Sequence, residues 1–284
     1  MPKMFSIIAP PVRKRLPFAI VLAGTWLVMV TIAPQASAQG VSLPEGSDAV
    51  PDARPAKGNW RVAVGAGVRL RPSYEGSDRF KVSPVPFVSV DWKDRIFLEP
   101  ERGLGVYALR TENLRLGMSI GMAPGRSKDD DRRLRGLDKI GPGARGRVFG
   151  FYTIGMLRLG LDVTKDFGGG DGLMIRPSAA LQVPLTDSLK LSTGASLTWA
   201  NDKHMQAFFG ISPSQAQQTR YQRFDAKAGI KSADLQVGLA WAMSEHWFMQ
   251  ANVGLKILLG DAADSPLTRK RVAPSAGVVL GYRF

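Results

Sequence analysis

Along most of this chain, hydrophobic residues alternate with small or charged ones, and this period of two constrains the fold more than any other feature. In residues 60–70 the even positions hold Trp, Val, Ala and Leu, whereas the odd positions hold Arg, Ala and Gly. Side chains of a β-strand point alternately to opposite faces, so the pattern predicts a strand with one apolar face. It recurs to the C-terminus and predicts twelve strands, with ten as the alternative: 60–70, 82–92, 96–98, 104–108, 114–122, 148–154, 157–163, 173–183, 189–199, 235–243, 247–257 and 276–284.

Alternation alone does not show whether the apolar face meets a protein core or lipid, because a soluble β-sandwich alternates too. The lengths help, since most stretches are near the roughly 9–11 residues with which a tilted strand crosses a bilayer. The connections mostly alternate between short and long, as in outer-membrane barrels with short periplasmic turns and long external loops. The exception is residues 99–103, a short connection where a long one is expected. We therefore predict an all-β fold, a transmembrane antiparallel β-barrel over residues 58–284.

Aromatic residues and the end of the chain support a barrel in a membrane. Outer-membrane barrels carry aromatic girdles at both interfaces. The long-loop end offers only Phe80 and Trp199, but the last apolar positions alternate up to a terminal Phe284, an ending that resembles the final strand of bacterial outer-membrane proteins. At the predicted periplasmic ends, four tryptophans share the outward parity: Trp60, Trp92, Trp241 and Trp247.

The first 38 residues read as a secretory signal peptide. Four basic residues precede an apolar run at 18–32, and the small residues Ala36-Ser37-Ala38 follow it. An uncleaved membrane anchor is the alternative, but the run is short for a helical span. Residues 39–57 are rich in Pro, Gly, Ser and Asp and predict a flexible periplasmic lead-in. Of the formal charge of +14, this segment carries four positive charges and no negative one, so the predicted mature chain carries +10.

Export and composition exclude several classes of function. A basic chain often binds nucleic acid, but an exported one does not meet it, so we expect no nucleic-acid partner. With no cysteine, the chain has no disulfide, thiolate metal site or Cys nucleophile. The absence of thiols also suits the oxidising periplasm. The surroundings that we expect are instead the lipid of the outer membrane.

Several local motifs resemble the MipA/OmpV family, the MltA-interacting proteins of the Gram-negative outer membrane. The two longest are LTWANDKHMQAFFGIS at 197–212 and LLGDAADSP at 258–266. The shorter ones are YEGSD at 74–78, DRIFL at 94–98, RGLG at 102–105 and GYRF at 281–284. The family more often has Tyr where this chain has His204. The resemblance implies a scaffold that brings a murein-degrading lytic transglycosylase together with a murein synthase, whereas other members are described as porin-like proteins or adhesins. It supplies no catalytic residues to transfer.

Few residues offer catalytic or metal chemistry. Past the predicted signal peptide the only histidines are His204 and His246. Asp202 and His204 together would suit activation of water at a barrel rim. We favour a solvated loop histidine and expect no enzyme. Glycine-rich 168–172 predicts a tight turn, and Asp129–Asp131 predict a salt-paired loop. Asp261 and Asp264 predict an Asx-type turn rather than a calcium site. We expect no cofactor and no metal.

The inward face of the predicted barrel is basic. Four acidic residues share the inward parity: Asp91, Asp162, Asp166 and Asp234. Two interpretations remain open, an anion-preferring lumen and a lumen closed by loops whose acids neutralise the arginines. Our leading hypothesis is a structural scaffold, with a small anion-preferring porin as the alternative. Against the four acids stand eleven basic residues: Arg61, Arg69, Lys81, Arg115, Arg145, Arg147, Arg158, Arg176, Lys190, Lys256 and Arg283.

Overall fold

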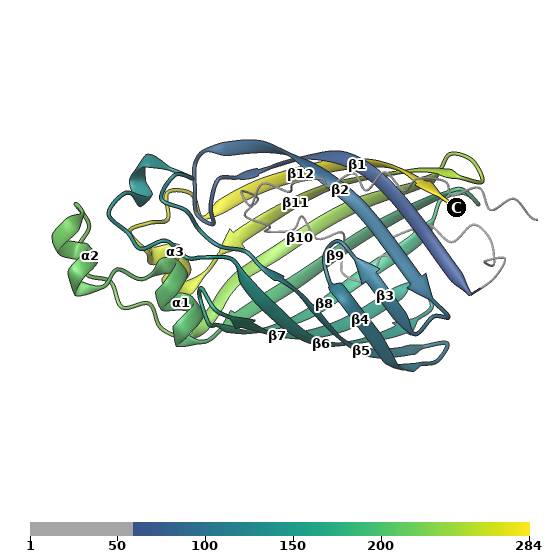
Figure 1. The fold of residues 1–284 in the computed structure, drawn as a ribbon, viewed down its shortest axis with the longest axis horizontal. Helices are drawn as coiled ribbons and strands as arrows, with labels where there is room; N and C mark the ends of the chain where they lie inside the picture. The colour runs from purple at the N-terminus through teal and green to yellow at the C-terminus, as the bar shows by residue number, and fades with distance from the viewer. Residues whose placement is uncertain (1–58) are drawn as a thin grey trace, which may run out of the picture. The chain divides into compact units, whose positions relative to one another are not determined.

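Residues 59–284 form a closed antiparallel barrel of twelve strands in the computed structural model, which describes that range (Figure 1). Twelve strands are confirmed and ten are not, because β1 pairs with β12 and closes the ladder. The predicted signal peptide and lead-in lie outside the described residues. The strands are β1 (Trp60–Pro72), β2 (Phe80–Trp92), β3 (Ile96–Glu99), β4 (Gly103–Arg110), β5 (Leu114–Ala123), β6 (Gly143–Ile154), β7 (Leu157–Phe167), β8 (Leu173–Pro184), β9 (Leu189–Ala200), β10 (Gly229–Ala242), β11 (Trp247–Leu258) and β12 (Val272–Arg283).

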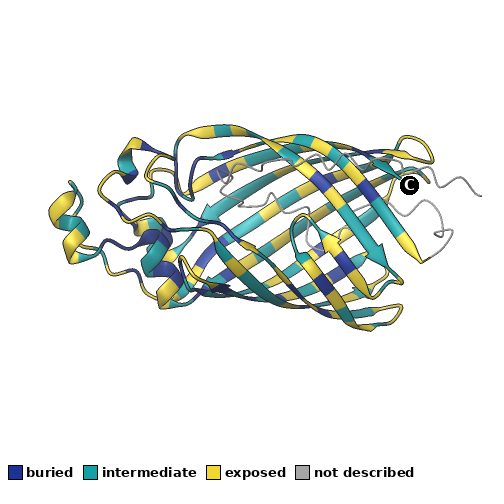
Figure 2. Cartoon of the chain, viewed as in Figure 1, coloured by how far each residue is buried: buried dark blue, intermediate teal, exposed yellow. Residues whose placement is uncertain are grey.

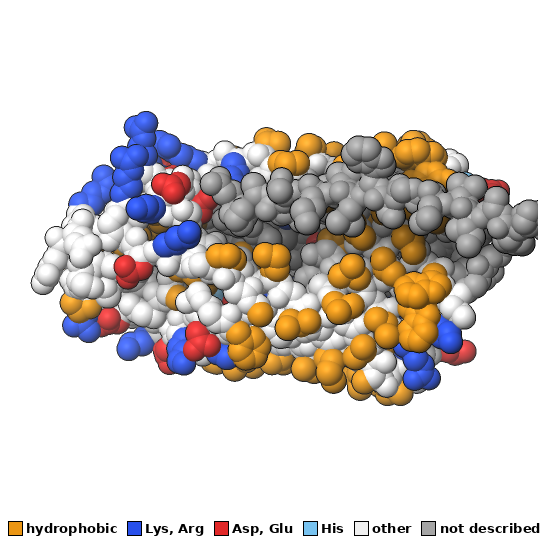
Figure 3. Space-filling view, viewed as in Figure 1, with side chains coloured by type: hydrophobic (Ala, Val, Ile, Leu, Met, Phe, Trp, Pro, Cys, Tyr) orange, Lys and Arg blue, Asp and Glu red, His pale blue; other side chains and the backbone are white. Residues whose placement is uncertain are grey.

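The wall is apolar outside and mixed inside. In β1, Val64 is exposed whereas its neighbour Ala63 is buried, and this alternation runs along the strands (Figure 2). Apolar side chains gather on the outer face of the strands (Figure 3). Exposed apolar surface of this extent is unfavourable in water. In a bilayer it is favourable, because a closed ladder pairs the backbone groups that lipid cannot hydrogen-bond.

Two strands start earlier than the alternation predicts. β6 begins at Gly143 and β10 at Gly229, whereas their predicted first residues are Val148 and Leu235. The start of β6 is Gly-Ala-Arg-Gly-Arg, with too few large apolar residues to show a period. In β10 the register shifts between Ile230 and Ser232. A bulge of this kind adds a residue to one strand and reverses the parity before it, so the pattern is lost from the sequence.

The long connections fold over one end of the barrel, which we call the long-loop end. They form α1 (Asp202–Phe209), α2 (Pro213–Gln218), α3 (Gly260–Asp264) and a 3₁₀ turn at Arg132–Leu134. Asn201 caps α1 by accepting the backbone N–H of His204, and a capping box of Ser212 and Gln215 starts α2. Within residues 59–284, no helix has both the length and the apolar character needed to span a membrane.

A hydrophobic cluster ties these loops to the strand ends, and we call α1, α3 and this cluster the lid. Met205, Phe208 and Phe209 of α1 lie at its centre, and all three are buried. Burial of such side chains contributes about 1.5–3 kcal/mol each. The lid is therefore a packed layer. The remaining members are Ile140, Met174, Ala200, Ala226, Leu258 and Ala262.

One part of the wall is incomplete. β3 and β4 are short and lie at the opposite, short-turn end (Figure 1). β3 pairs only with residues 90–92 of β2, and β4 pairs with β5 only as far as Ile120. Residues 80–89 of β2 therefore pair with β1 alone, and Met122 and Ala123 of β5 pair with β6 alone. We call this missing stretch of two strands the wall gap; the unexpectedly short connection at 99–103 is the turn at its lower edge.

Candidate functional site

A cavity of about 460 Å³ occupies the half of the lumen beneath the lid. Its roof includes His204 and Phe208 of α1, and its walls come from strands around the barrel. Small residues leave this space free, since Gly194, Gly254 and Ser275 occupy inward positions of three different strands. The charged residues of the lining are Arg69, Arg71, Glu75, Glu101, Arg145, Arg147, Arg176, Lys231, Asp234 and Lys256.

His204 is held in the roof by its helix and by a close glycine. Its ring stacks on Phe208 one turn along α1, with centroids 4.6 Å apart. Gly172, at the start of the β7–β8 connection's return to the sheet, lies directly against it. A Cβ at Gly172 would be 2.4 Å from the Cβ of His204. This glycine is therefore required for the approach of α1 to the barrel.

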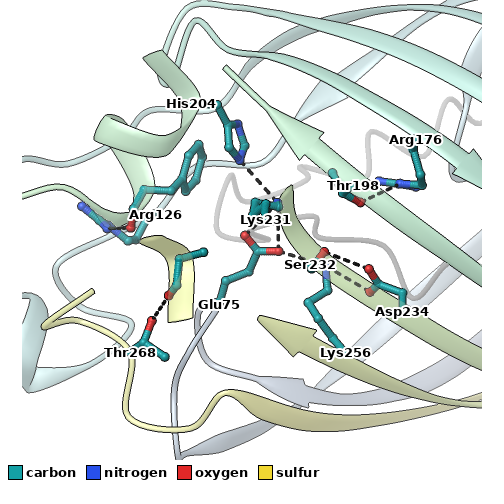
Figure 4. Close-up of polar contacts among 12 residues, drawn as sticks. Glu75, Arg126, Arg176, Thr198, His204, Lys231, Ser232, Asp234, Lys256 and Thr268 are labelled. Carbon is teal, nitrogen blue, oxygen red and sulfur yellow. Dashed lines mark hydrogen bonds and ion pairs between the residues drawn. The ribbon is translucent and has the colours of Figure 1, made fainter. Parts of the chain in front are cut away.

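Beneath His204 lies an ion-pair cluster that joins three parts of the chain (Figure 4). Glu75, from the β1–β2 loop, accepts hydrogen bonds from Lys231 at 3.1 and 3.2 Å and from Lys256 at 2.9 Å. Lys256 also pairs with Asp234 at 3.3 Å. We call Glu75, Lys231, Asp234 and Lys256 the Glu75 cluster. Its two ammonium groups and two carboxylates balance, so it fastens the loop to β10 and β11 without leaving net charge.

The surroundings shift the protonation of the two loop groups in this region. Burial alone would raise the pKa of Glu75, but Lys231 and Lys256 outweigh it and hold that pKa well below its ordinary value. Burial, together with the charge of Lys231, lowers the pKa of His204 well below its ordinary value. The neutral imidazole accepts from Lys231 through Nε2 at 3.4 Å, which places its proton on Nδ1. Nδ1 is buried and has no hydrogen-bond partner among residues 59–284.

Two arginines of the cavity wall are neutralised by buried acids. Arg145 forms a bidentate pair with Asp166, at 2.5 and 2.8 Å, and Arg147 pairs with Asp162 at 2.8 Å. Both aspartates lie inward on β7, in register with the arginines of β6 or one step from them. Planar guanidinium and carboxylate groups match in this geometry. Much of the inward positive charge in this part of the wall is therefore balanced.

Aromatic side chains fill the lumen toward the short-turn end. Phe97, Tyr107, Phe149 and Phe151 form one cluster of rings, with Phe97 and Tyr107 only 4.8 Å apart. The guanidinium of Arg102 lies 5.1 Å from the ring of Phe149 and 4.9 Å from that of Phe151. Across the lumen, Phe87 packs on Phe248, with centroids 5.6 Å apart. The cavity thus lies between the lid and a layer of packed rings.

The predicted lumen residues occupy three different environments. Arg69, Arg176 and Lys256 line the cavity. Arg61 pairs with Asp91 and Asp94 at the short-turn end, and Lys81 pairs with Asp130 at 3.3 Å. Three do not line the cavity, namely Arg115, Arg158 and Lys190. Arg283 also lies apart from it and donates to the carbonyls of Ser244 and Glu245.

Three charged residues of the cavity escape the sequence pattern: Arg71, Glu75 and Lys231. Arg71 lies one inward step beyond the predicted end of the first strand. Lys231 has the outward parity of β10, and the bulge at Ile230–Ser232 turns it inward. Glu75 lies in a loop 156 residues from its partner Lys231, so no local pattern reveals the pair. Its place in the YEGSD motif is the one available signal.

Two expectations about single residues are wrong. His204 is not a solvated loop residue, because it is 3% exposed in the lid. Its neighbour Asp202 accepts the backbone N–H of Ala228 instead of orienting the imidazole. Asp261 and Asp264 lie in the short helix α3 rather than in an Asx-type turn. His246 is exposed in the turn between β10 and β11 and stacks on Tyr282.

The other acidic and glycine-rich motifs have structural partners. Residues 168–172 form the expected turn, with positive φ angles at Gly168, Gly169 and Asp171. The salt-paired loop is also confirmed, since Asp130 and Asp131 pair with basic residues of the β1–β2 region. Within the part of the chain that the structure describes, no group of three or more His, Asp and Glu residues is arranged to hold a metal ion.

Comparison with known proteins identifies one family. The sequence profile of the family described as MltA-interacting protein MipA matches residues 64–284. No curated protein matches the chain with significant similarity.

Three solved outer-membrane structures illustrate what a structural comparison finds. OmpT of Vibrio cholerae is 9% identical, with 80% of this chain and 97% of that chain covered and a TM-score of 0.36. A bacterial polysaccharide outer membrane secretin is 9% identical, with 81% and 99% covered and a TM-score of 0.41. OprD of Pseudomonas aeruginosa is 7% identical, with 80% and 65% covered and a TM-score of 0.35. At these scores the similarity carries no argument about function.

Proposed function

Because this chain belongs to the MipA family, we propose that it is a docking protein of the outer membrane for enzymes of cell-wall turnover. The family description names interaction with MltA, and the family resemblance points to a lytic transglycosylase and a murein synthase as the partners. We further propose that the chain itself performs no catalysis. His204 supports this view, because it is buried and bonded to a lysine, with no nucleophile paired to it.

The lumen is the observation that carries a docking role over a transport role. The lid closes one end with a packed hydrophobic cluster, and rings fill the lumen toward the other end. Between them, buried acids neutralise Arg145 and Arg147. A general diffusion pore needs a continuous water-filled path, whereas a platform for partners needs a stable body with an accessible rim. The described barrel has the features of the second.

Site-directed labelling tests this proposal, because the chain has no cysteine of its own. We would place single cysteines at Asp187→Cys, in a short turn, and at Ser214→Cys, in α2 of the long-loop end. Both parent residues lie at exposed positions. Each protein, reconstituted in nanodiscs, would carry a bulky maleimide conjugate and be used to capture murein enzymes from a periplasmic extract. The short-turn end faces the periplasm in outer-membrane barrels.

The two conjugates have opposite expected results. The conjugate at position 187 should reduce capture of murein enzymes at least tenfold, because it covers the periplasmic rim. The matched conjugate at position 214 should leave capture unchanged. Equal recovery with an unrelated barrel, before any labelling, would overturn the docking role.

A small anion-preferring channel is the second candidate, and the cavity lining favours it. Seven basic residues face three acidic ones there. On this proposal, single channels in a planar bilayer should prefer chloride to potassium, and added salt should weaken the preference. Replacing Arg69 and Arg176 by Gln should reduce it. Cation selectivity in the unmodified protein would exclude this candidate.

A further inference from the structure

The wall gap exposes one edge of β2 within the apolar band of the barrel. The amide of Lys93 donates to the carbonyl of Asn59, which fixes the hydrogen-bonding phase between β1 and β2. Odd-numbered residues of β2 therefore bond to β1, and even-numbered residues direct their backbone groups toward the gap. Two of those even positions are Pro84 and Pro86.

The two prolines suit an edge that faces lipid. Proline has no N–H, so each removes a donor that would be left unpaired in the gap. An unpaired backbone donor costs several kcal/mol in hydrocarbon. Proline also blocks pairing with another strand, which is how natural sheets protect free edges. The edge is therefore adapted to remain without a neighbouring strand.

The cavity extends to the rims of this gap. Its lining includes Pro100, Glu101 and Gly103 from the turn at the lower edge of the gap. It also includes Met122 and Pro124 from the β5 side. If β2 and β5 keep their course past the short hairpin, three strand spacings separate them, or about 14 Å. The lid closes the cavity on the loop side, so the gap is its lateral exit into the membrane.

The charge of the cavity defines which headgroup fits there. Of the seven basic residues in the lining, Arg145 and Arg147 are neutralised by Asp166 and Asp162, which lie outside the lining. Counting these two acids with Glu75, Glu101 and Asp234 leaves an excess of two positive charges. Guanidinium groups recognise phosphate by paired, charge-assisted hydrogen bonds. A volume of about 460 Å³ is within the ordinary range for small-molecule sites.

We propose that the wall gap is a lateral opening through which an anionic amphiphile of the surrounding leaflet places a phosphorylated headgroup in the cavity. Its apolar chains remain outside, against the gap rims. On the outer surface of these rims, Val82 and Met122 are both 68% exposed. Arg69, on β1 beside β2, and Arg176, on β8 across the lumen, contribute to the positive lining that receives the headgroup.

Binding of phosphatidic acid to the full mature protein tests the opening, with phosphatidylcholine as the neutral comparison. Native mass spectrometry of detergent-solubilised protein would measure both. We expect one tightly bound phosphatidic acid, held at least tenfold more strongly than phosphatidylcholine. The double variant Arg69→Gln, Arg176→Gln should lose most of this preference. The control Lys190→Gln, an exposed inward position outside the cavity, should keep it.

A chemical bridge across the gap separates a membrane route from a soluble one. In the variant Val82→Cys, Met122→Cys, a bis-maleimide of matching length would join the two rims, and a monofunctional maleimide would serve as the control. Heat-modifiable gel mobility would confirm that every variant is folded. The bridge should reduce phosphatidic acid binding at least tenfold, and the control label should not.

Two results would overturn the proposal. One is equal binding of phosphatidic acid and phosphatidylcholine, unaffected by the arginine variant. The other is binding of inorganic phosphate in the cavity that displaces phosphatidic acid and is unchanged by the bridge, because that result would identify a site for soluble anions reached by another path.

Discussion

Replacing Glu75 by Gln should loosen the lid without opening the barrel. The Glu75 and Lys231 side chains are 10% and 6% exposed, so the variant leaves the ammonium of Lys231 buried without its carboxylate. Lys256 keeps Asp234 at 3.3 Å, which concentrates the penalty on Lys231. Removing one partner of a buried pair costs about 3–5 kcal/mol. If the lid opens by breaking this contact, its open population should rise by about a hundredfold to a few thousandfold.

Hydrogen exchange measures this change directly. Peptides covering residues 73–79 and α1 report opening of the loop and lid, whereas strand amides report the barrel. We expect protection to fall in the first group and to persist in the second. Adding Lys231→Met to Glu75→Gln should restore part of the protection, since the unpaired charge is then gone. Asp225→Asn is the matched control, because the Arg223–Asp225 pair is exposed and such pairs contribute about 1 kcal/mol or less.

The result that would refute this reasoning is unchanged exchange of the β1–β2 loop in Glu75→Gln. The Glu75 cluster would then be a contact that the loop does not depend on. A uniform loss of protection, strands included, would instead show that the cluster supports the whole barrel rather than the lid.

Three further predictions follow from the same geometry. Val64→Arg should cost about 2–4 kcal/mol in unfolding measured by denaturant titration, whereas the cavity-facing Ser275→Arg should cost less than half as much; equal costs would contradict the assignment of faces. Because the pKa of His204 is lowered in the closed lid, its stabilising effect is complete above the ordinary value near 6.5 and falls with decreasing pH, by up to about 1.4 kcal/mol per unit; exchange corrected for intrinsic rates should show this, and His204→Gln should abolish it. Gly172→Ala should raise α1 exchange, since its Cβ would lie 2.4 Å from that of His204, whereas Gly229→Ala, which meets nothing within 4 Å, should not.

The barrel can be predicted from the sequence because its information is local. Each strand shows its inward and outward faces through a period of two, and no distant contact alters that parity. The lid is different, although part of its signal is local too. Asn201 before the apolar pattern of Met205, Phe208 and Phe209 is a helix start with one buried face. Reading the segment as a solvated loop overlooked this pattern.

The cavity depends on information that alternation does not carry. A single bulge reverses the parity of Lys231, and Glu75 reaches it only because the loop folds back over the rim. Counting inward charges along strands therefore found Arg69, Arg176 and Lys256 but omitted the carboxylate that neutralises part of their field. The balance between basic and acidic residues in a lumen is set by loops as much as by strands.

The short hairpin and the acidic loop act on the same part of the wall. Where β3 and β4 end, β2 has no strand partner, and the connection between β5 and β6 passes above this stretch. Asp130 pairs there with Lys81 at the end of β2, at 3.3 Å, and Asp131 approaches Arg79 at 3.8 Å. Arg133 of the same connection pairs with Asp78. These contacts fix the loop to the β1–β2 region and border the wall gap from above. A gap with one edge protected by prolines and another fixed by ion pairs is a built part of this barrel, because random loss of two half-strands would leave neither.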